Sequence, residues 1–358
     1  MNIQHPKHPY SKSIRVLVVD DSALVREVLS RGLDADPEIT VVGTASDPYA
    51  ARDKIVALKP HVITLDVEMP RMDGVTFLRR LMPQYPLPVV MVSALTHTGA
   101  QITLDALEAG AVDFVTKPKA DIARSLSAMI HELRSKVKIA ATANLSHWQS
   151  KNAGSAIQTL SMPSKKILSA SSEKVILIGA STGGTEAVRQ ILTSFPASVP
   201  GVVIVQHMPP GFTRAFAERL NTLCAVEVKE AENNDRIIAG RALIAPGGVQ
   251  TRVFRSGGTY VVKCESGSPV CGHCPSVEVL MQSASEYIGP YAIGIMLTGM
   301  GRDGATGMLS LRKSGARTLA QDEASSVVFG MPKEAFACGG AERLVSLDQI
   351  ADEILKLL

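Results

Sequence analysis

The chain has 358 residues, a length more typical of two domains than of one. Hydrophobic residues make up 46% of it and charged residues 20%, which supplies enough apolar material for packed cores and excludes a disordered chain. The 37 Lys and Arg residues against 34 Asp and Glu residues give a formal charge of +3, too small and too dispersed for a surface that binds nucleic acid or a membrane.

Signals for secretion or membrane insertion are not recognisable. Residues 1–13 are polar and contain proline and histidine, and no stretch approaches the roughly 18 uninterrupted apolar residues of a membrane-spanning helix. The five cysteines are odd in number and all follow residue 223, which argues against a disulfide framework. We therefore expect a soluble, cytoplasmic protein.

Short apolar runs alternate with amphipathic stretches from residue 14 to about residue 130. The expected strands are Ile14–Val19, Thr40–Val42, Val62–Leu65, Pro88–Val92 and Asp113–Val115. The expected helices include Ala23–Leu33, Tyr49–Leu58 and Gln101–Ala109. Fully apolar strands separated by helices are typical of a parallel sheet that is covered on both faces. The sequence therefore predicts a doubly wound α/β domain over residues 14–131.

Residues 132–172 lose this pattern and are rich in Ala, Ser, Lys and Thr, which is typical of an interdomain linker, although a helical hairpin is an alternative. The alternation resumes over residues 173–358. The expected strands are Lys174–Ile178, Gly201–Val205 and Tyr291–Leu297. Two helices are expected to contain Ala187–Leu192 and Phe212–Leu220, a third is expected to begin near Gly304, and a fourth is expected over Leu347–Leu358. Between them, Thr251–Arg255 and Thr259–Lys263 flank Ser256-Gly257-Gly258 and predict a β-hairpin. The second domain is therefore expected to be α/β with an antiparallel insertion.

Polar residues follow the expected strands of the first domain where those strands end. The first strand ends in Asp20-Asp21, the third in Asp66, the fourth in Ser93 and the fifth in Lys117. The carboxyl ends of parallel strands meet at one edge, where ligands bind. Neighbouring carboxylates repel one another, and Mg²⁺, which prefers oxygen ligands, would relieve this repulsion. One carboxylate could then accept a phosphoryl group held by the lysine and the serine.

Simpler roles exist for each of these residues alone. Asp20-Asp21 could cap the following helix, and Lys117 could be a solvated loop residue, but their joint position at successive strand ends favours a site. Pro118 after Lys117 suggests a rigid turn that aims the lysine inward.

On these residues, the first domain resembles the receiver domain of two-component response regulators, which has a flavodoxin-like fold. The resemblance implies that Asp66 is the phospho-acceptor and that Asp20, Asp21, Asp66 and the backbone carbonyl of Glu68 bind Mg²⁺. It also implies that Ser93 and Lys117 contact the phosphoryl group and that a sensor histidine kinase is the phosphodonor. Phe114 occupies the position of the family's aromatic switch residue.

The second domain carries a serine in a glycine-rich turn after its first strand, in Gly179-Ala180-Ser181-Thr182-Gly183-Gly184. This turn could hold a nucleotide phosphate or could expose a nucleophile, as G-x-S-x-G does. Ser181 replaces the second glycine of the nucleotide motif, and the next strand ends in Gln206-His207 rather than in an acid. The nucleophile is therefore favoured, with His207 at the neighbouring strand end as its base.

A third residue of such a site would orient the imidazole. The loop after the strand Tyr291–Leu297 brings Asp303 to the same edge and exposes backbone N–H groups near Met300, which could bind an oxyanion. Asp303 could instead be the N-cap of the next helix.

Over residues 172–356 the sequence resembles the catalytic domain of chemotaxis protein-glutamate methylesterases. The resemblance rests on the strings GASTGG, QHMPPGFTRAFAERL, IAPGG, TGMGRDGATGM and AQDEASSVVFGMPKEA. It implies a Rossmann-like domain in which Ser181 is the nucleophile, His207 the base and Asp303 the orienting acid. The Met300 amide would bind the oxyanion, and Thr182 would support the site.

The same resemblance implies a substrate and a mode of control. The substrates would be γ-glutamyl methyl esters of methyl-accepting chemoreceptors, with deamidation of receptor glutamines as a second activity. Phosphorylation of Asp66 would relieve inhibition by the receiver. The esterase would need no cofactor, and a monomer that neither binds nucleic acid nor enters the membrane is expected. A non-catalytic response regulator that acts as a signalling scaffold is the alternative.

One motif departs from the family pattern. Family members often have His-Arg-Pro-Ser-Val-Asp where this chain has His273-Cys274-Pro275-Ser276-Val277-Glu278, so the contacts of that arginine are in doubt. Cys264, Cys271, His273 and Cys274 lack the second ligand pair that a structural zinc site usually needs, which argues against zinc.

Overall fold

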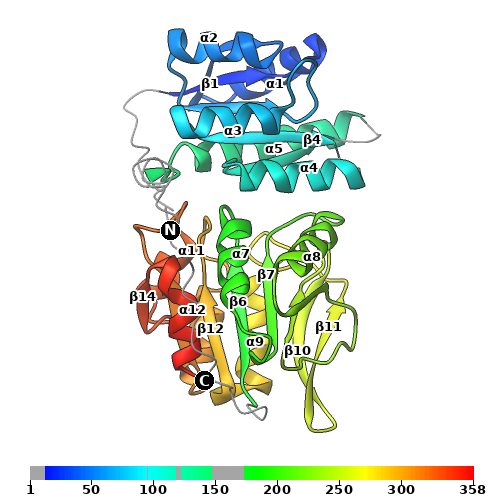
Figure 1. Cartoon of the computed structure of the whole chain (residues 1–358), viewed down its shortest axis with the longest axis vertical. Coiled ribbons are helices and arrows are strands. Elements are labelled where there is room, and N and C mark those ends of the chain that lie inside the picture. The colour runs from blue at the N-terminus through cyan, green and yellow to red at the C-terminus, as the bar shows by residue number, and fades with distance from the viewer. Residues whose placement is uncertain (1–12, 95, 118–121, 147–172) are drawn as a thin grey trace. The chain divides into compact units, whose positions relative to one another are not determined.

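The computed structural model describes residues 13–94, 96–117, 122–146 and 173–358 (Figure 1). The chain divides into two compact units, Met1–Ser155 and Ala156–Leu358. This division falls within the stretch expected to be a linker, of which residues 147–172 lie outside the described residues, as does Pro118. No helix in the described part of the chain is long and apolar enough to cross a membrane.

The first unit contains a five-stranded parallel sheet with strand order β2-β1-β3-β4-β5. This is the flavodoxin-like order, and it confirms the predicted doubly wound fold. The strands are β1 (Ile14–Val19), β2 (Ile39–Ala45), β3 (Val62–Asp66), β4 (Val89–Ala94) and β5 (Asp113–Lys117). The helices are α1 (Ala23–Asp34), α2 (Pro48–Leu58), α3 (Gly74–Gln84), α4 (His97–Glu108) and α5 (Ile122–Ala140).

Local sequence explains where the helices of the first unit begin. The Ser22 hydroxyl accepts a hydrogen bond from Val25 N–H at the start of α1, and the Asp73 carboxylate accepts one from Thr76 N–H at the start of α3. These caps start each helix just after a strand end, so the polar residues between strand and helix stay at one edge of the sheet.

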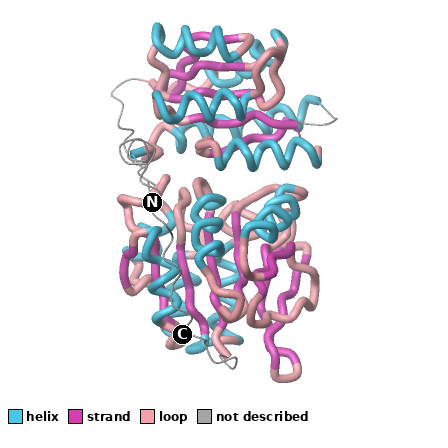
Figure 2. Tube along the Cα trace, in the orientation of Figure 1, coloured by secondary structure: helices cyan, strands magenta, loops and turns pink. Residues whose placement is uncertain are grey.

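The second unit contains a seven-stranded parallel sheet with strand order β14-β13-β12-β6-β7-β9-β8. Its strands are β6 (Val175–Ala180), β7 (Val202–Gln206), β8 (Glu227–Glu230), β9 (Arg241–Ile244), β12 (Ala292–Met296), β13 (Arg317–Gln321) and β14 (Arg343–Val345). A separate antiparallel hairpin consists of β10 (Gln250–Ser256) and β11 (Thr259–Glu265) (Figure 2). The predicted Rossmann-like fold and the predicted hairpin are confirmed.

The helices of the second unit cover this sheet. They are α7 (Gly184–Ser194), α8 (Phe212–Leu223), α9 (Val277–Tyr287), the 3₁₀ helix η1 (Gly289–Tyr291), α10 (Ala305–Lys313), α11 (Met331–Ala337) and α12 (Leu347–Lys356). Helix α9 packs closely on β6, because a Cβ atom added to Gly179 would lie 2.3 Å from Val277 Cγ1. Only glycine allows this approach, and it brings the N-terminal end of α9 to the strand ends.

The sheet of the second unit changes direction at its centre. From β6 the chain continues to the neighbouring β7 on one side, whereas β12 adds to the other side of β6. Such a switch point leaves a crevice beyond the carboxyl ends of the strands, where open α/β sheets bind their ligands.

Candidate functional site

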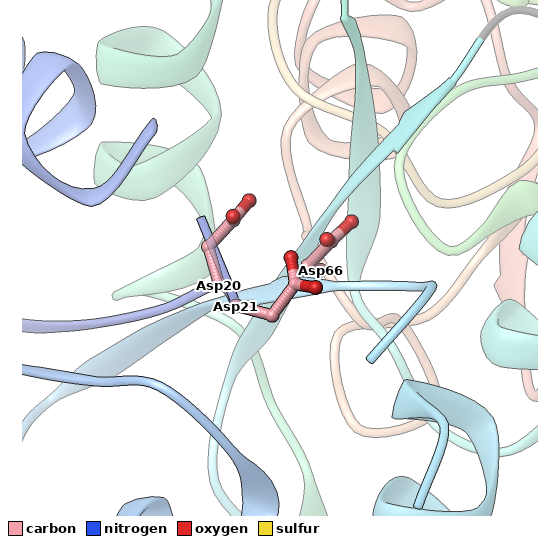
Figure 3. A group of neighbouring side chains, drawn as sticks. All are labelled: Asp20, Asp21 and Asp66. Atoms are coloured by element: carbon pink, nitrogen blue, oxygen red, sulfur yellow. The ribbon is translucent and has the colours of Figure 1, made fainter. Parts of the chain in front are cut away.

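Three carboxylates gather at the carboxyl ends of β1 and β3, as the sequence predicts (Figure 3). One ligand atom from each of Asp20, Asp21 and Asp66 lies within 4.8 Å of the others. Asp20 and Asp66 are buried, and Asp21 is exposed. Lys117 Nζ lies 2.9 Å from Asp20 Oδ2 and 2.9 Å from Asp66 Oδ1. The structure therefore brings together the lysine and the three acids.

Burial controls the electrostatics of this cluster. Burial raises the pKa of Asp66 to about 6 against the opposing effect of Lys117, and the Asp20 carboxylate adds to the rise. Burial lowers the pKa of Lys117, but Asp66 and Asp20 outweigh that effect and the pKa is raised. Three hard oxygen donors that repel one another fit Mg²⁺. Asp21, Asp66, Glu68 and Lys117 all line one open cavity of about 960 Å³.

Ser93 is held differently from the other predicted residues of this site. Its hydroxyl is buried and accepts a hydrogen bond of 2.7 Å from Thr103 Oγ1 on α4. Thr103 Oγ1 also lies 2.6 Å from Gly99 O. Because Ser93 is the acceptor in the bond with Thr103, its own hydroxyl proton is used elsewhere, in a long contact of 3.4 Å to Gly99 O, and it is this contact that a phosphoryl oxygen would replace. Phe114 is buried, with Lys136 Nζ 5.0 Å from its ring centroid.

In the second unit, Ser181 and His207 follow adjacent strand ends. Ala180 on β6 is in register with Gln206 on β7. Ser181 directly follows Ala180 and His207 directly follows Gln206, so the two residues leave the sheet at neighbouring positions. His207 N–H donates a hydrogen bond of 3.1 Å to Ala180 O. Ser181 N–H donates one of 3.0 Å to Thr298 O, beyond the end of β12. Ser181 therefore lies at the switch point of the sheet.

The Gln206 side chain connects the two predicted catalytic residues through their main chains. Its Nε2 donates hydrogen bonds to Ser181 O (3.0 Å) and to His207 O (3.3 Å). Gly299 also constrains the serine, because a Cβ atom added there would lie 2.7 Å from Ser181 Cβ. The sequence alone gives Gln206 no role beyond its place at a strand end where a nucleotide-binding domain would carry an acid.

His207 and Asp303 form a buried pair. His207 Nε2 lies 2.7 Å from Asp303 Oδ2, and the two side chains are 7% and 1% exposed. Asp303 also accepts hydrogen bonds from Ser276 Oγ (2.6 Å), Val277 N–H (2.7 Å) and Glu278 N–H (3.1 Å). Burial raises the pKa of Asp303, but the bonds from His207, Ser276 and Val277 outweigh it and hold the pKa below its ordinary value.

The alternative role of Asp303 as an N-cap of the following helix is wrong. The N-cap of α10 is Gly304, which makes no side-chain cap bond. Asp303 instead accepts hydrogen bonds from the first N–H groups of α9. This N-terminal end of α9 is the positive end of the helix dipole, which stabilises a carboxylate. The carboxylate is thus fixed between a helix N-terminus and the imidazole.

The remaining groups are placed around this pair. His207 Nδ1 is buried and has no hydrogen-bond partner among the described residues, so the bond between Ser181 and His207 is not made. Because Nε2 faces Asp303, Nδ1 is the ring nitrogen left for the serine.

Met300 N–H has no hydrogen-bond acceptor in the described part of the chain. Thr182 is buried, and its carbonyl accepts a bond of 3.0 Å from the Thr298 hydroxyl.

The first unit is thus of the receiver class, with an acidic site at its strand ends. The second is of the serine-hydrolase class, with an alcohol, an imidazole and a carboxylate at a switch point. A family model described as CheB methylesterase matches residues 176–354, and one described as response regulator receiver domain matches residues 16–131. The chain belongs to the CheB methylesterase family, in the form that carries a receiver domain.

Curated relatives match nearly the whole chain. The protein-glutamate methylesterase/protein-glutamine glutaminase of Syntrophotalea carbinolica is 66% identical over 97% of this chain and 98% of its own length. The protein of the same name from Sulfurimonas denitrificans is 52% identical over 97% of this chain and 99% of its own length. The crystal structure of the Thermotoga maritima CheB methylesterase catalytic domain has a TM-score of 0.51 and 33% identity, covering 52% of this chain and 98% of that one.

Proposed function

We propose that the chain is a protein-glutamate methylesterase and protein-glutamine glutaminase that acts on methyl-accepting chemoreceptors and is activated by phosphorylation. The observation that carries the chemistry is the orientation of His207. Its Nε2 is hydrogen-bonded to a buried carboxylate, its Nδ1 has no hydrogen-bond partner among the described residues, and His207 follows the strand next to the one that precedes Ser181. The names and high identity of the full-length relatives support the substrate class.

In the proposed reaction, Ser181 Oγ attacks the acyl carbon of a γ-glutamyl methyl ester while His207 Nδ1 accepts its proton. Asp303 stabilises the imidazolium that results, and Met300 N–H donates to the oxyanion. The imidazolium then protonates the leaving methoxide, and methanol departs. Water attacks the acyl-enzyme, with His207 as base again, and releases the glutamate and the serine. An amide in place of the ester gives deamidation, with ammonia as the leaving group.

Control is assigned to the first unit, with Asp66 as the acceptor of a phosphoryl group from a sensor histidine kinase. Asp20, Asp21, Asp66 and the carbonyl of Glu68 would hold Mg²⁺, which would neutralise the charge of the phosphoryl group. Lys117 already contacts two of these carboxylates and is available to the phosphoryl oxygens. We further propose that the protein works in the cytoplasm as a monomer.

The test measures methanol released from methylated receptor, and conversion of receptor glutamine to glutamate by mass spectrometry. The full-length protein should release methanol and should release it faster after incubation with an acyl phosphate and Mg²⁺. A chain that accepts phosphate but releases no methanol from any methylated receptor would contradict the proposal. A matched control is Asp66→Asn, which should release methanol at the same rate with and without the acyl phosphate.

A further inference from the structure

One short segment contacts both members of the imidazole–carboxylate pair. This covering segment, Cys271–Glu278, precedes and begins α9 and contains the departure from the family motif. Ser276, Val277 and Glu278 donate hydrogen bonds to Asp303. His273 contacts the other member, because its ring stacks on the ring of His207.

The stack is close and nearly parallel. The two ring centroids are 3.6 Å apart and the ring planes differ by 10°. The His207 imidazole is therefore restrained at two places. Asp303 holds the ring at Nε2 by a hydrogen bond, and His273 lies against the face of the ring.

The hydrogen bond to Asp303 alone does not fix the direction of Nδ1. The torsion that rotates a histidine ring is broad and soft. Nε2 lies nearer to the axis of the Cβ–Cγ bond than Nδ1 does, so rotation about that bond moves Nε2 less and Nδ1 more. A flat group against the ring face opposes this rotation, and His273 supplies one.

His273 is itself anchored. Its N–H and carbonyl form a pair of 3.0 Å hydrogen bonds with Val270, and its carbonyl also accepts a bond of 3.1 Å from Gln250 Nε2. Gln250 Oε1 accepts a bond from Ser276 N–H (2.9 Å), and Ser276 Oγ bonds to Asp303. The contacts thus form a closed ring that runs through the base, its acid and the stacked imidazole.

We propose that His273 is a positioning residue for acyl transfer, which keeps Nδ1 of His207 directed at Ser181 by stacking on its ring. The inference rests on the proposed function, since it concerns the same serine and the same base. It assigns to His273 a role through shape rather than through proton transfer. A flat, non-titratable ring at this position should therefore preserve most of the activity.

The test compares His273→Ala with His273→Phe in the full-length protein, on methylated receptor. We expect kcat of His273→Ala to fall about 30-fold, with KM within about 3-fold of wild type, because misdirection of a catalytic group costs rate rather than affinity. His273→Phe should retain kcat within about 5-fold of wild type, because the phenyl ring can also stack. Cys274→Ser, in the same segment, is the matched control and should leave both constants unchanged, since among the described residues its thiol makes a single long contact of 3.9 Å, to Gly267 O.

A spectroscopic measurement checks the positioning without turnover. In ¹⁵N spectra, the His207 imidazole signals should broaden by exchange in His273→Ala and stay sharp in His273→Phe. Wild-type kcat in His273→Ala, an equal loss in both variants, or a rise in KM alone would overturn the inference while wild type still demethylates. Absence of methanol release from wild type would overturn the proposed function together with it.

Discussion

Replacement of Asp303 by asparagine preserves the shape of the side chain but removes one of its two acceptor oxygens. Oδ1 accepts from Ser276 Oγ and Glu278 N–H, and Oδ2 accepts from Val277 N–H and lies beside His207 Nε2. The amide can be placed in two orientations, and in each of them the NH₂ group replaces one acceptor oxygen and faces the groups that donate to that oxygen in the wild type. At least one buried N–H group is then left without an acceptor.

The expected losses of stability and of kcat in Asp303→Asn follow from these contacts. An unpaired buried N–H group costs about 1 to 3 kcal/mol of stability. If the NH₂ group faces His207, Nε2 must accept, which puts the ring proton on Nδ1 and prevents it from accepting the proton of Ser181. In the other orientation a neutral amide no longer stabilises the imidazolium. From the corresponding substitution in the Ser-His-Asp template, we expect kcat to fall about 10⁴-fold.

Methanol release from methylated receptor measures this fall, and calorimetry of the second unit measures the stability. Asp352→Asn, the same chemical change on an exposed residue in the middle of α12, should alter neither. A kcat for Asp303→Asn within tenfold of wild type, in a folded protein, would refute the assignment of Asp303 as the residue that orients the base.

The pH dependence of the stability has a definite sign. The pKa of Asp303 is held below its ordinary value, so the stability contributed by its ionised form is fully present above the unfolded pKa of about 3.9. It is lost as the pH falls through the lower, folded pKa. The difference in unfolding free energy between wild type and Asp303→Asn should therefore narrow below about pH 4.

Three further predictions concern the first unit. Asp66→Asn should abolish phosphoryl incorporation, measured with labelled phosphodonor, and leave basal methanol release unchanged; incorporation at the wild-type level would exclude Asp66 as the acceptor. Chelation of divalent cations should block phosphorylation but not basal methanol release, because Asp20, Asp21 and Asp66 of the first unit are the one carboxylate cluster suited to a metal in the described part of the chain. Removal of residues 1–140 should raise basal methanol release; a truncated protein no faster than the unphosphorylated full chain would show that the receiver does not inhibit.

The strand ends could be predicted from the sequence because the central strands are short, apolar and fully buried. Such runs locate Asp66, Lys117, Ser181 and His207 at sheet edges without knowledge of side-chain contacts. Four strands of the second unit, β8, β9, β13 and β14, are not among those that the sequence predicts. The edge strand β8 has the charged sequence Glu-Val-Lys-Glu and lacks an apolar run, and the other three are only three to five residues long and each begin with an arginine. Apolar runs are therefore predicted more reliably than short strands that contain charged residues.

The partners of Asp303 and Ser93 could not be predicted, because they depend on contacts between distant segments. Local rules predict that Ser276 caps α9, yet its hydroxyl bonds to Asp303, 27 residues away. The Ser93 hydroxyl similarly bonds to Thr103 on α4. The string His273 to Glu278 was noticed as a motif, but the stack of His273 on His207 appears only when the covering segment is folded over the strand ends.

The central claim is that Ser181 is the nucleophile, and the most direct test is methanol release by Ser181→Ala after phosphorylation. The variant should accept a phosphoryl group on Asp66 as wild type does, because Asp66 lies in a separate compact unit. Its methanol release should fall by at least about 10³-fold. Release within tenfold of wild type from the phosphorylated variant would contradict the account.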